Sequence, residues 1–222
     1  MTPTDPVGAE PTGLVVFDLD GTLLCGPTVC EILAEPLGRG AAMRRFEGLS
    51  SEPDIAKSRV VMASWYRGIP LEKLCDPLKR ATWRPGVNSA IALLREAGIE
   101  VAIATMTWRF AAKRLAERIG VSRVLGTELG QDEIIGHVWP RDKGDFLRAL
   151  SKELGVPQQR TAAVGDSLND TFLLTAASLR FFVGEGTLPT GLDVRHKPSA
   201  DMLSIAREVV ECWSVGRGDS AG

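Results

Sequence analysis

The chain has 222 residues, of which 44% are hydrophobic and 24% charged, and its formal net charge is −2. This length suits one catalytic domain with at most a small subdomain. The balanced charge argues against nucleic acid and membranes as partners, and every apolar run is shorter than the roughly 20 residues that cross a bilayer. We therefore expect a cytoplasmic protein that acts as a monomer or a homodimer.

Short apolar runs alternate with helical periodicity along most of the chain. The runs predict strands over residues 14–17, 99–105, 123–125, 161–164 and 179–183. Their uniform apolar character is typical of strands that are covered on both faces. Between the runs, apolar side chains recur at the three- and four-residue spacing of helices. This pattern predicts an α/β fold with a doubly wound, mainly parallel sheet, whose ligands bind beyond the carboxyl ends of the strands.

Two segments depart from this alternation. Residues 26–82 have helical periodicity without an intervening strand, which predicts an all-helical cap inserted after the first strand. Residues 127–138 contain Gly-Gln-Asp in their middle and predict a β-hairpin near a sheet edge. The expected organisation is a core of residues 13–25 and 83–213, the cap over 26–82, and disordered tails over 1–12 and 214–222.

The first predicted strand delivers two carboxylates to its carboxyl end, in the sequence Asp18-Leu-Asp20-Gly21-Thr22. In an extended chain Asp18 and Asp20 point the same way, because side chains repeat every two residues. Two carboxylates this close repel each other unless a cation or a shared proton compensates. An acidic turn would explain an isolated D-x-D. The apolar strand before this one and the Gly-Thr after it favour a functional site.

A second acidic cluster follows the predicted strand over 161–164, in the sequence Gly165-Asp166-Ser-Leu-Asn-Asp170. The four-residue spacing predicts that Asp166 and Asp170 share one face of the first turn of a helix. A helix cap would explain one of these residues. Together the two clusters form an oxygen-rich site of the kind that Mg²⁺ prefers, and such an ion suits a phosphorylated substrate.

Four motifs in this order resemble those of the haloacid dehalogenase superfamily of phosphotransferases. They are the Asp18 motif, a strand that ends at Thr105, Lys143 at the start of Lys-Gly-Asp-Phe-Leu, and the Asp166 motif. The resemblance extends over residues 14–184. The place of the helical insertion, between the first two motifs, is similar to the small cap of the phosphoserine phosphatase branch. The resemblance implies a sheet of the superfamily's Rossmann-like type.

The resemblance implies a phosphomonoester hydrolase that dephosphorylates a small metabolite. Asp18 is implied to attack phosphorus and form an aspartyl-phosphate. Asp20 is implied to protonate the leaving alcohol and then to activate water. The implied phosphate-binding residues are Thr105, Met106 and Lys143.

The cofactor that the resemblance implies is Mg²⁺. Its implied ligands are Asp18, the backbone carbonyl of Asp20, and Asp166. Asn169 and Asp170 are implied to orient the catalytic lysine and the waters on the metal.

The chain departs from the phosphoserine phosphatase pattern at the predicted substrate pocket. Pro27 stands where that branch has a glutamate for the substrate amine, and Thr105-Met106-Thr107 replaces its Ser-Gly-Gly. Arg59 matches the branch's carboxylate-binding arginine, although an arginine on a cap helix can also be a surface charge. Phe46 is a candidate wall of the pocket or a packing residue. These departures predict a substrate other than phosphoserine, with an anionic or hydroxylated tail and no ammonium.

Two other functions are compatible with the same residues. A phosphotransferase or mutase would pass the phosphoryl group from Asp18 to another hydroxyl, and the sequence does not separate it from a hydrolase. A non-catalytic binding protein could keep the fold. The complete set of motif residues argues against the second alternative, because the fold alone needs none of these charges.

Overall fold

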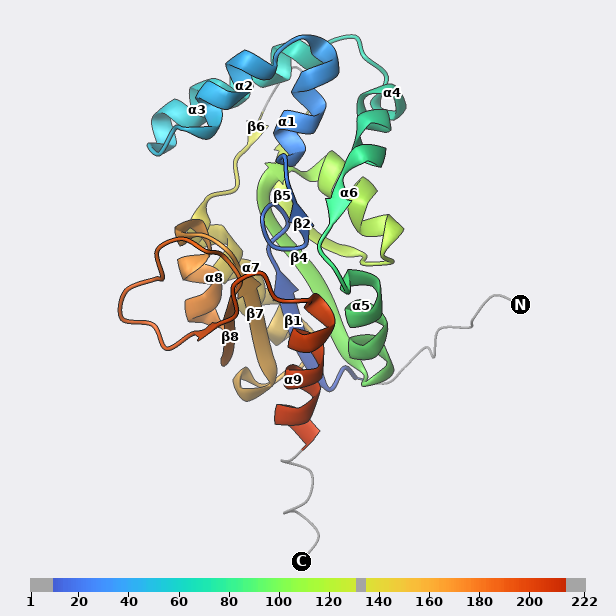
Figure 1. The fold of residues 1–222 in the computed structure, drawn as a ribbon, viewed down its shortest axis with the longest axis vertical. Coiled ribbons are helices and arrows are strands. Elements are labelled where there is room, and N and C mark those ends of the chain that lie inside the picture. Colours follow the sequence, from blue (N-terminus) through green and yellow to red (C-terminus); the bar gives the residue numbers. More distant parts are fainter. Residues whose placement is uncertain (1–9, 131–134, 215–222) are drawn as a thin grey trace, which may run out of the picture.

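The computed structural model describes residues 10–130 and 135–214 (Figure 1). Its centre is a seven-stranded sheet in the order β6-β5-β4-β1-β7-β8-β9. All neighbouring strands run parallel except β6, which is antiparallel to β5. This order confirms the predicted doubly wound, mainly parallel sheet. The strands are β1 (Gly13–Phe17), β2 (Leu24–Cys25), β3 (Thr82–Trp83), β4 (Ile99–Trp108), β5 (Arg123–Leu129), β6 (Ile135–Gly136), β7 (Thr161–Gly165), β8 (Leu179–Phe182) and β9 (Arg195–His196).

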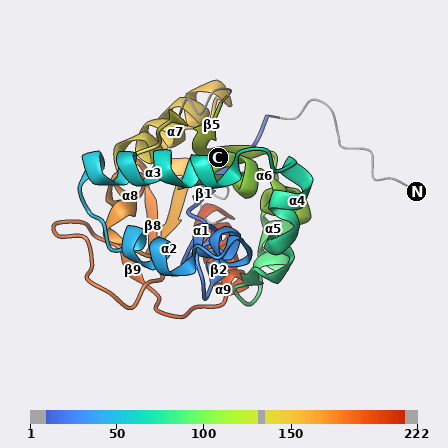
Figure 2. The ribbon, with the colours of Figure 1, turned by 90° about the horizontal axis from the view of Figure 1, so that it is seen from above.

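Helices cover both faces of this sheet. Along β1, Val15 and Phe17 pack into one apolar cluster with α5, α6 and α9, whereas Leu14 and Val16 pack into another with α7 and α8. Figure 2 shows the two groups of helices on opposite sides of the strands. Strands buried on both faces read as continuous apolar runs, which explains the sequence of β1. The helices are α5 (Val87–Glu96), α6 (Arg109–Arg118), α7 (Pro140–Glu153), α8 (Thr171–Ala176) and α9 (Met202–Ser214), with short 3₁₀ turns η4 (Gln158–Arg160) and η5 (Leu168–Asp170).

The inserted residues form a helical segment at one end of the sheet (Figure 1). Thr28 and Glu31 cap the first of its helices reciprocally, and Ser51 accepts a hydrogen bond from Asp54 at the start of the longest one. Gly38 ends the 3₁₀ turn after this first helix in the left-handed conformation, at φ +69°. The segment consists of α1 (Val29–Ala34), η1 (Glu35–Leu37), α2 (Gly40–Glu47), α3 (Glu52–Tyr66), α4 (Leu71–Cys75) and η2 (Asp76–Arg80).

Two very short strands join the helical segment to the sheet. Leu24 pairs with Trp83 and Cys25 with Thr82, so β2 and β3 form an antiparallel ribbon, here called the linker ribbon. The sequence predicted no strand between residues 26 and 82, but Thr82 belongs to β3, so this prediction is wrong at its last residue. Two-residue strands carry too little periodicity to be recognised.

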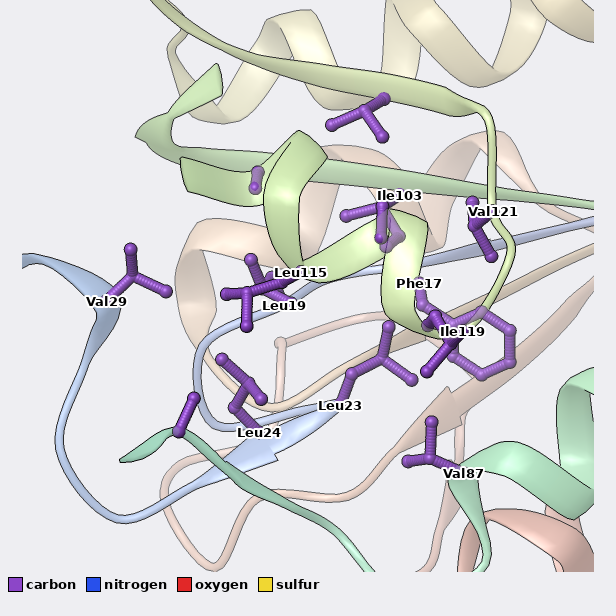
Figure 3. Close-up of a cluster of buried hydrophobic side chains, with 14 of the residues drawn as sticks. Phe17, Leu19, Leu23, Leu24, Val29, Val87, Ile103, Leu115, Ile119 and Val121 are labelled. Atoms are coloured by element: carbon purple, nitrogen blue, oxygen red, sulfur yellow. The ribbon is translucent and has the colours of Figure 1, made fainter. Parts of the chain in front are cut away.

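Apolar contacts run without a break from the sheet to the helical segment. Phe17 on β1, Leu19 and Leu23 in the following loop, and Val29 on α1 belong to one buried cluster (Figure 3). Each of these four side chains is at most 1% exposed. Their burial fixes the loop that carries Asp18, because its apolar residues anchor it on both sides of the acidic ones.

Strand β4 is longer than predicted. It continues past Thr105 to Trp108, and the following helix begins at Arg109. The pairing of β4 with β5 is interrupted between Ala104 and Trp108. The buried Trp108 ring, which contacts Tyr66 edge-on at 5.8 Å between ring centroids, holds the strand beyond this irregularity.

The predicted hairpin over 127–138 is present as the antiparallel pair β5–β6, in which Leu129 faces Ile135. The Gln131-Asp132 part of its predicted turn lies outside the described residues.

The predicted tails over 1–12 and 214–222 fall mostly outside the described residues, and two of their described positions are ordered. Thr12 donates its backbone N–H to Gly98 O at 2.8 Å and its hydroxyl to Ala97 O at 2.9 Å. Ser214 is the last residue of α9. Hydrogen bonds to the neighbouring helix end offset the entropy cost of ordering Thr12. In the described ranges, we find no helix with the length and apolarity needed to cross a membrane.

Candidate active site

Asp18 occupies the first position after β1, at the carboxyl edge of the sheet. Its backbone N–H donates to Val164 O on β7 at 2.9 Å, which continues the parallel ladder, and its side chain is buried. Gly21 then turns the chain at φ +82°, a conformation that suits glycine. A Cβ atom at Gly21 would overlap Asp166 Oδ2, so glycine also permits the close approach of the two acidic loops.

A buried lysine bridges the two acidic loops. Lys143, in the first turn of α7, places Nζ 2.7 Å from Asp18 Oδ1 and 2.7 Å from Asp170 Oδ1. Lys143 is 2% exposed and Asp170 is fully buried. Burial alone would lower the pKa of Lys143, but the charges of Asp170 and Asp18 raise it above its usual value. The ammonium is therefore permanently charged and compensates the two carboxylates.

The Asp166 loop is organised by the carboxylate of Asp170. Asp170 Oδ2 accepts hydrogen bonds from the backbone N–H groups of Asp166 and Ser167, each at 3.1 Å. Asp170 ends η5 and precedes α8. The prediction that Asp166 and Asp170 share the first turn of a helix is therefore wrong. The four-residue spacing instead lets the Asp170 side chain fold back onto the Asp166 amide, as in an N-terminal cap.

The carboxylates of Asp18, Asp166 and Asp170 converge, with one oxygen of each within 4.8 Å of the others. Burial raises the pKa of Asp18 well above its usual value, against the opposing charge of Lys143. Burial also raises the pKa of Asp166, although Thr22 Oγ1 donates to its Oδ1 at 2.9 Å. Crowded, desolvated carboxylates are stabilised by a divalent cation, so these residues fit Mg²⁺.

The acidic residues of this site differ in how free their carboxylates are to bind a cation. The hydrogen bonds of Asp170 to Lys143 and to two amides occupy both of its oxygens, which leaves Asp18 and Asp166 as the more available carboxylates. The carboxylate of Asp20 is not part of the converging group. Its Oδ1 accepts the N–H of Val29 at 2.7 Å, at the entrance to the helical segment. Burial raises the pKa of Asp20 to about 7, which suits a group that gives and takes a proton near neutral pH.

A cavity of about 200 Å³ lies between these carboxylates and the helical segment. Asp18, Asp20, Thr105, Met106 and Lys143 all line it, as does Asn169 from the second acidic loop. The structure therefore brings the predicted catalytic and phosphate-binding residues to one cavity. Lys143 donates to Asp18 and Asp170, and among the described residues no hydrogen bond joins Asn169 to this lysine.

The segment after Thr105 forms one wall of this cavity. The Thr105 hydroxyl accepts the N–H of Thr107 at 3.2 Å, and the Thr107 hydroxyl lies 3.2 Å from Cys30 Sγ. The carbonyl of Met106 accepts from Arg59 and from Thr127. These bonds fix the wall where the pairing of β4 is interrupted.

Arg59 reaches from α3 across the cavity to the sheet side. Its Nη2 donates to Met106 O and to Val138 O, each at 3.0 Å, and its Nη1 lies 3.1 Å from His137 Nδ1. The guanidinium also lies 4.8 Å from the centre of the Trp139 ring. Burial lowers the pKa of Arg59 to about 10, so it stays charged at neutral pH. Among the described residues no carboxylate is recorded within ion-pair distance of it, and Arg59 is not a surface charge.

The aromatic residues of the helical segment have separate roles. Phe46 and Met62 line the cavity. Trp65 stacks on Phe46 at 5.6 Å between ring centroids, and Tyr66 packs against Trp108. The alternatives left open for Phe46 are thus both realised, because it packs on Trp65 and also faces the cavity.

Several cavity residues were not predicted from the sequence, and two of them, Glu47 and Cys30, carry polar or titratable groups. The Glu47 carboxylate accepts the Thr28 hydroxyl at 2.7 Å, and partial burial raises its pKa. A signal for Glu47 was present, because Met43, Phe46 and Glu47 follow the i, i+3, i+4 spacing of one helix face.

Comparisons with known proteins agree with this arrangement. The model of the haloacid dehalogenase-like hydrolase family matches residues 15–175. Phosphoserine phosphatase SerB2 of Mycobacterium tuberculosis is 28% identical over 75% of this chain, but the chain spans only 42% of that protein. Phosphoserine phosphatase of Methanocaldococcus jannaschii is 27% identical over 75% of this chain and 83% of its own length. A substrate-bound phosphoserine phosphatase structure is similar in fold, with a TM-score of 0.74, 21% identity, and coverage of 90% of this chain and 99% of that chain.

Proposed function

Because the chain belongs to the haloacid dehalogenase-like hydrolase family, we propose that it is a Mg²⁺-dependent phosphatase that hydrolyses the phosphomonoester of a small metabolite through an aspartyl-phosphate. The observation that carries the proposal is the buried Asp18, which faces the cavity at the end of β1 and is held by Lys143. The phosphoserine phosphatase relatives support the same enzyme class.

In the first step, Asp18 is the nucleophile in its ionised form, which the Lys143 ammonium at 2.7 Å favours against the effect of burial on the pKa. Lys143 holds Oδ1, and the hydrogen bonds in the described residues leave Oδ2 available to attack phosphorus. The new Oδ2–P bond forms as the bond between phosphorus and the ester oxygen breaks. Asp20, whose pKa burial raises to about 7, gives its proton to that oxygen, and the substrate leaves as the neutral alcohol.

In the second step, the Asp20 carboxylate takes a proton from water. The resulting hydroxide attacks phosphorus, the Oδ2–P bond breaks, and inorganic phosphate leaves with Asp18 restored. Lys143 and the hydroxyl of Thr105 face the transferred group and offset its charge in both steps.

Mg²⁺ would be held by Asp18, Asp166 and the backbone carbonyl of Asp20. When bound, it would neutralise phosphate charge and align the phosphoryl group for in-line attack. Asp170 would keep Lys143 and the Asp166 amide in place.

We propose that residues 26–82 act as a cap over this site. The contacts of Arg59 with the carbonyls of Met106 and Val138 support a closed arrangement, since they join α3 to the sheet side of the cavity. Closure over the cavity would exclude bulk water from the phosphoryl group.

The proposal of a substrate other than phosphoserine rests on Pro27 at the cavity entrance, while the cavity itself supports an anionic tail. Arg59 is a buried cation without a carboxylate partner in the described residues, so it suits an anionic tail. The Glu47 carboxylate also lines the cavity and accepts the Thr28 hydroxyl, so it suits a hydroxyl or an ammonium donor. Pro27 contributes no charge at the entrance. Met43 and Met62 add apolar surface that limits the size of the tail.

The test is phosphate release by the purified protein across phosphorylated amino acids, sugars, glycerates and small alcohols, with Mg²⁺ or with EDTA. We expect release that requires Mg²⁺ and is lost in Asp18→Asn, with a hydroxylated acid phosphate preferred over phosphoserine. Asp145→Asn is the matched control, because Asp145 lies on the exposed face of α7. No release from any compound would contradict a hydrolase. Transfer of the phosphoryl group to an added alcohol, without net phosphate, would identify a phosphotransferase. A cytoplasmic monomer or homodimer stays a prediction.

A further inference from the structure

Arg84 donates hydrogen bonds to three successive carbonyls of the loop between Asp18 and the helical segment. Arg84 is the residue directly after β3, where the chain returns from the helical segment to the sheet. Its backbone N–H donates to Leu23 O at 2.9 Å and its Nε donates to Thr22 O at 2.7 Å. Its Nη2 donates to Gly21 O. One residue therefore satisfies three consecutive carbonyls of the other linker.

The loop that Arg84 holds contacts Asp166, a candidate metal ligand. The hydroxyl of Thr22, which is fully buried, donates to Asp166 Oδ1 at 2.9 Å. The Gly21 backbone lies so close to Asp166 that a Cβ atom there would overlap its carboxylate. A shift of the Gly21–Thr22 peptide would thus move the Asp166 carboxylate relative to Asp18. Arg84 is placed to prevent that shift.

Ordinary ion pairing does not explain Arg84. In the part of the chain that the structure describes, no carboxylate lies within ion-pair distance of its guanidinium, which is half-buried on the two carbonyls. A lysine could supply the charge but not the planar fork that reaches two carbonyls at once.

We propose that Arg84 is a positioning residue for the divalent cation: by holding the carbonyls of Gly21 and Thr22, it places Asp166 and thereby sets the affinity of the site for Mg²⁺. The inference rests on the proposed function, because it requires a cation at Asp18 and Asp166. It assigns Arg84 no contact with the organic part of the substrate, since Arg84 does not line the cavity.

The experiment measures Mn²⁺ binding by electron paramagnetic resonance, with Arg84→Met, Arg84→Lys and Arg118→Met beside the wild type. Arg118 is the matched control, since its Nη1 donates to a carbonyl, Leu78 O at 3.1 Å, and its guanidinium lies over the neighbouring Trp83 ring. Among the described residues, no hydrogen bond joins Arg118 to the Gly21–Thr22 peptide. Phosphate release at saturating metal gives kcat and the KM for substrate.

We expect Arg84→Met to raise the Kd for Mn²⁺ by about tenfold or more, as loss of a residue that orients a metal ligand does. Arg84→Lys should recover part of this loss through its charge. Arg118→Met should leave the Kd unchanged while lowering the melting temperature. At saturating metal, Arg84→Met should keep the wild-type KM for substrate. If Arg84→Met does not fold, the comparison of Arg84→Lys with Arg118→Lys decides, with a severalfold rise in Kd expected for the first alone.

Two results would overturn the inference by itself: a wild-type Mn²⁺ affinity in both Arg84 variants, or an equal loss in the Arg118 variant. In either case the wild type would still bind Mn²⁺ and release phosphate. A wild-type protein that neither binds Mn²⁺ nor releases phosphate would overturn the proposed function, and the inference with it.

Discussion

Replacing Asp170 by asparagine removes one charge and one acceptor from a fully buried position without changing the size of the side chain. In the structure one oxygen of Asp170 accepts from Lys143 at 2.7 Å, and the other accepts from the amides of Asp166 and Ser167. An asparagine offers one acceptor oxygen and one NH₂ donor. In either orientation, its NH₂ group faces donors that carried a hydrogen bond in the wild type.

The smaller loss occurs when the amide oxygen stays on Lys143. Two backbone hydrogen bonds to a charged acceptor are then lost, each contributing roughly 1.5 kcal/mol or more. Lys143 keeps Asp18 as its remaining carboxylate partner within 2.7 Å. The expected loss in the free energy of unfolding is therefore about 3 to 5 kcal/mol, within the range for breaking a buried charge pair.

Urea unfolding monitored by tryptophan fluorescence measures this loss. With a urea m-value of about 3 kcal/mol per molar, expected for a chain of this size, Asp170→Asn should lower the unfolding midpoint by about 1 M or more. Asp145→Asn breaks an ion pair of α7 with Arg148 at 2.6 Å, where the Asp145 side chain is 65% exposed. Its cost should stay below about 0.5 kcal/mol. Equal midpoints for the two variants would refute the argument from buried hydrogen bonding.

Three further predictions concern the same site. Gly21→Ala should abolish phosphate release, because the new Cβ would overlap the Asp166 carboxylate. The control Gly26→Ala has a similar φ of +86° but open space around it, so it should cost only about 1–2 kcal/mol of backbone strain and keep activity. Equal activities of the two variants would contradict the overlap. Millimolar Mg²⁺ should raise the melting temperature of the wild type, measured by differential scanning fluorimetry, and EDTA should reverse this rise. Asp166→Asn should reduce the rise in melting temperature. An equal rise in the variant would exclude Asp166 as a ligand. Cys30 is half-buried in the cavity wall, and desolvation there raises its pKa to about 12. At pH 8, Ellman's reagent should therefore modify the exposed Cys212 much faster than Cys30 in the native protein. Equal labelling rates, read by peptide mass spectrometry, would contradict the raised pKa.

The sequence predicted best where local pattern and chemistry coincide. Strand β1 is an unbroken apolar run, and Asp18 follows it in a motif with glycine at a position of positive φ. Such signals need no knowledge of distant residues. Lys143 was found by its motif, but its two buried partners lie 125 and 27 residues away, and only the fold brings them together.

The errors and omissions have a common physical origin in contacts between distant segments. The extension of β4 to Trp108 depends on packing against Tyr66, which a strand-by-strand reading does not contain. The contacts of Arg59 with Met106 and Val138 span 47 and 79 residues. Arginines that bond to backbone carbonyls leave no compositional signature, so the sequence predicted no role for Arg84.

The linker ribbon has a consequence for how such a molecule can change. Because Cys25 and Thr82 are paired, the chain leaves and re-enters the sheet at adjacent points. Antiparallel strands of this kind can be closed by a turn of about two residues. In the topology of the fold, the whole helical segment therefore replaces the short turn that would connect β2 and β3. Its replacement by another module would alter which molecules reach Asp18 while leaving the architecture beneath it intact.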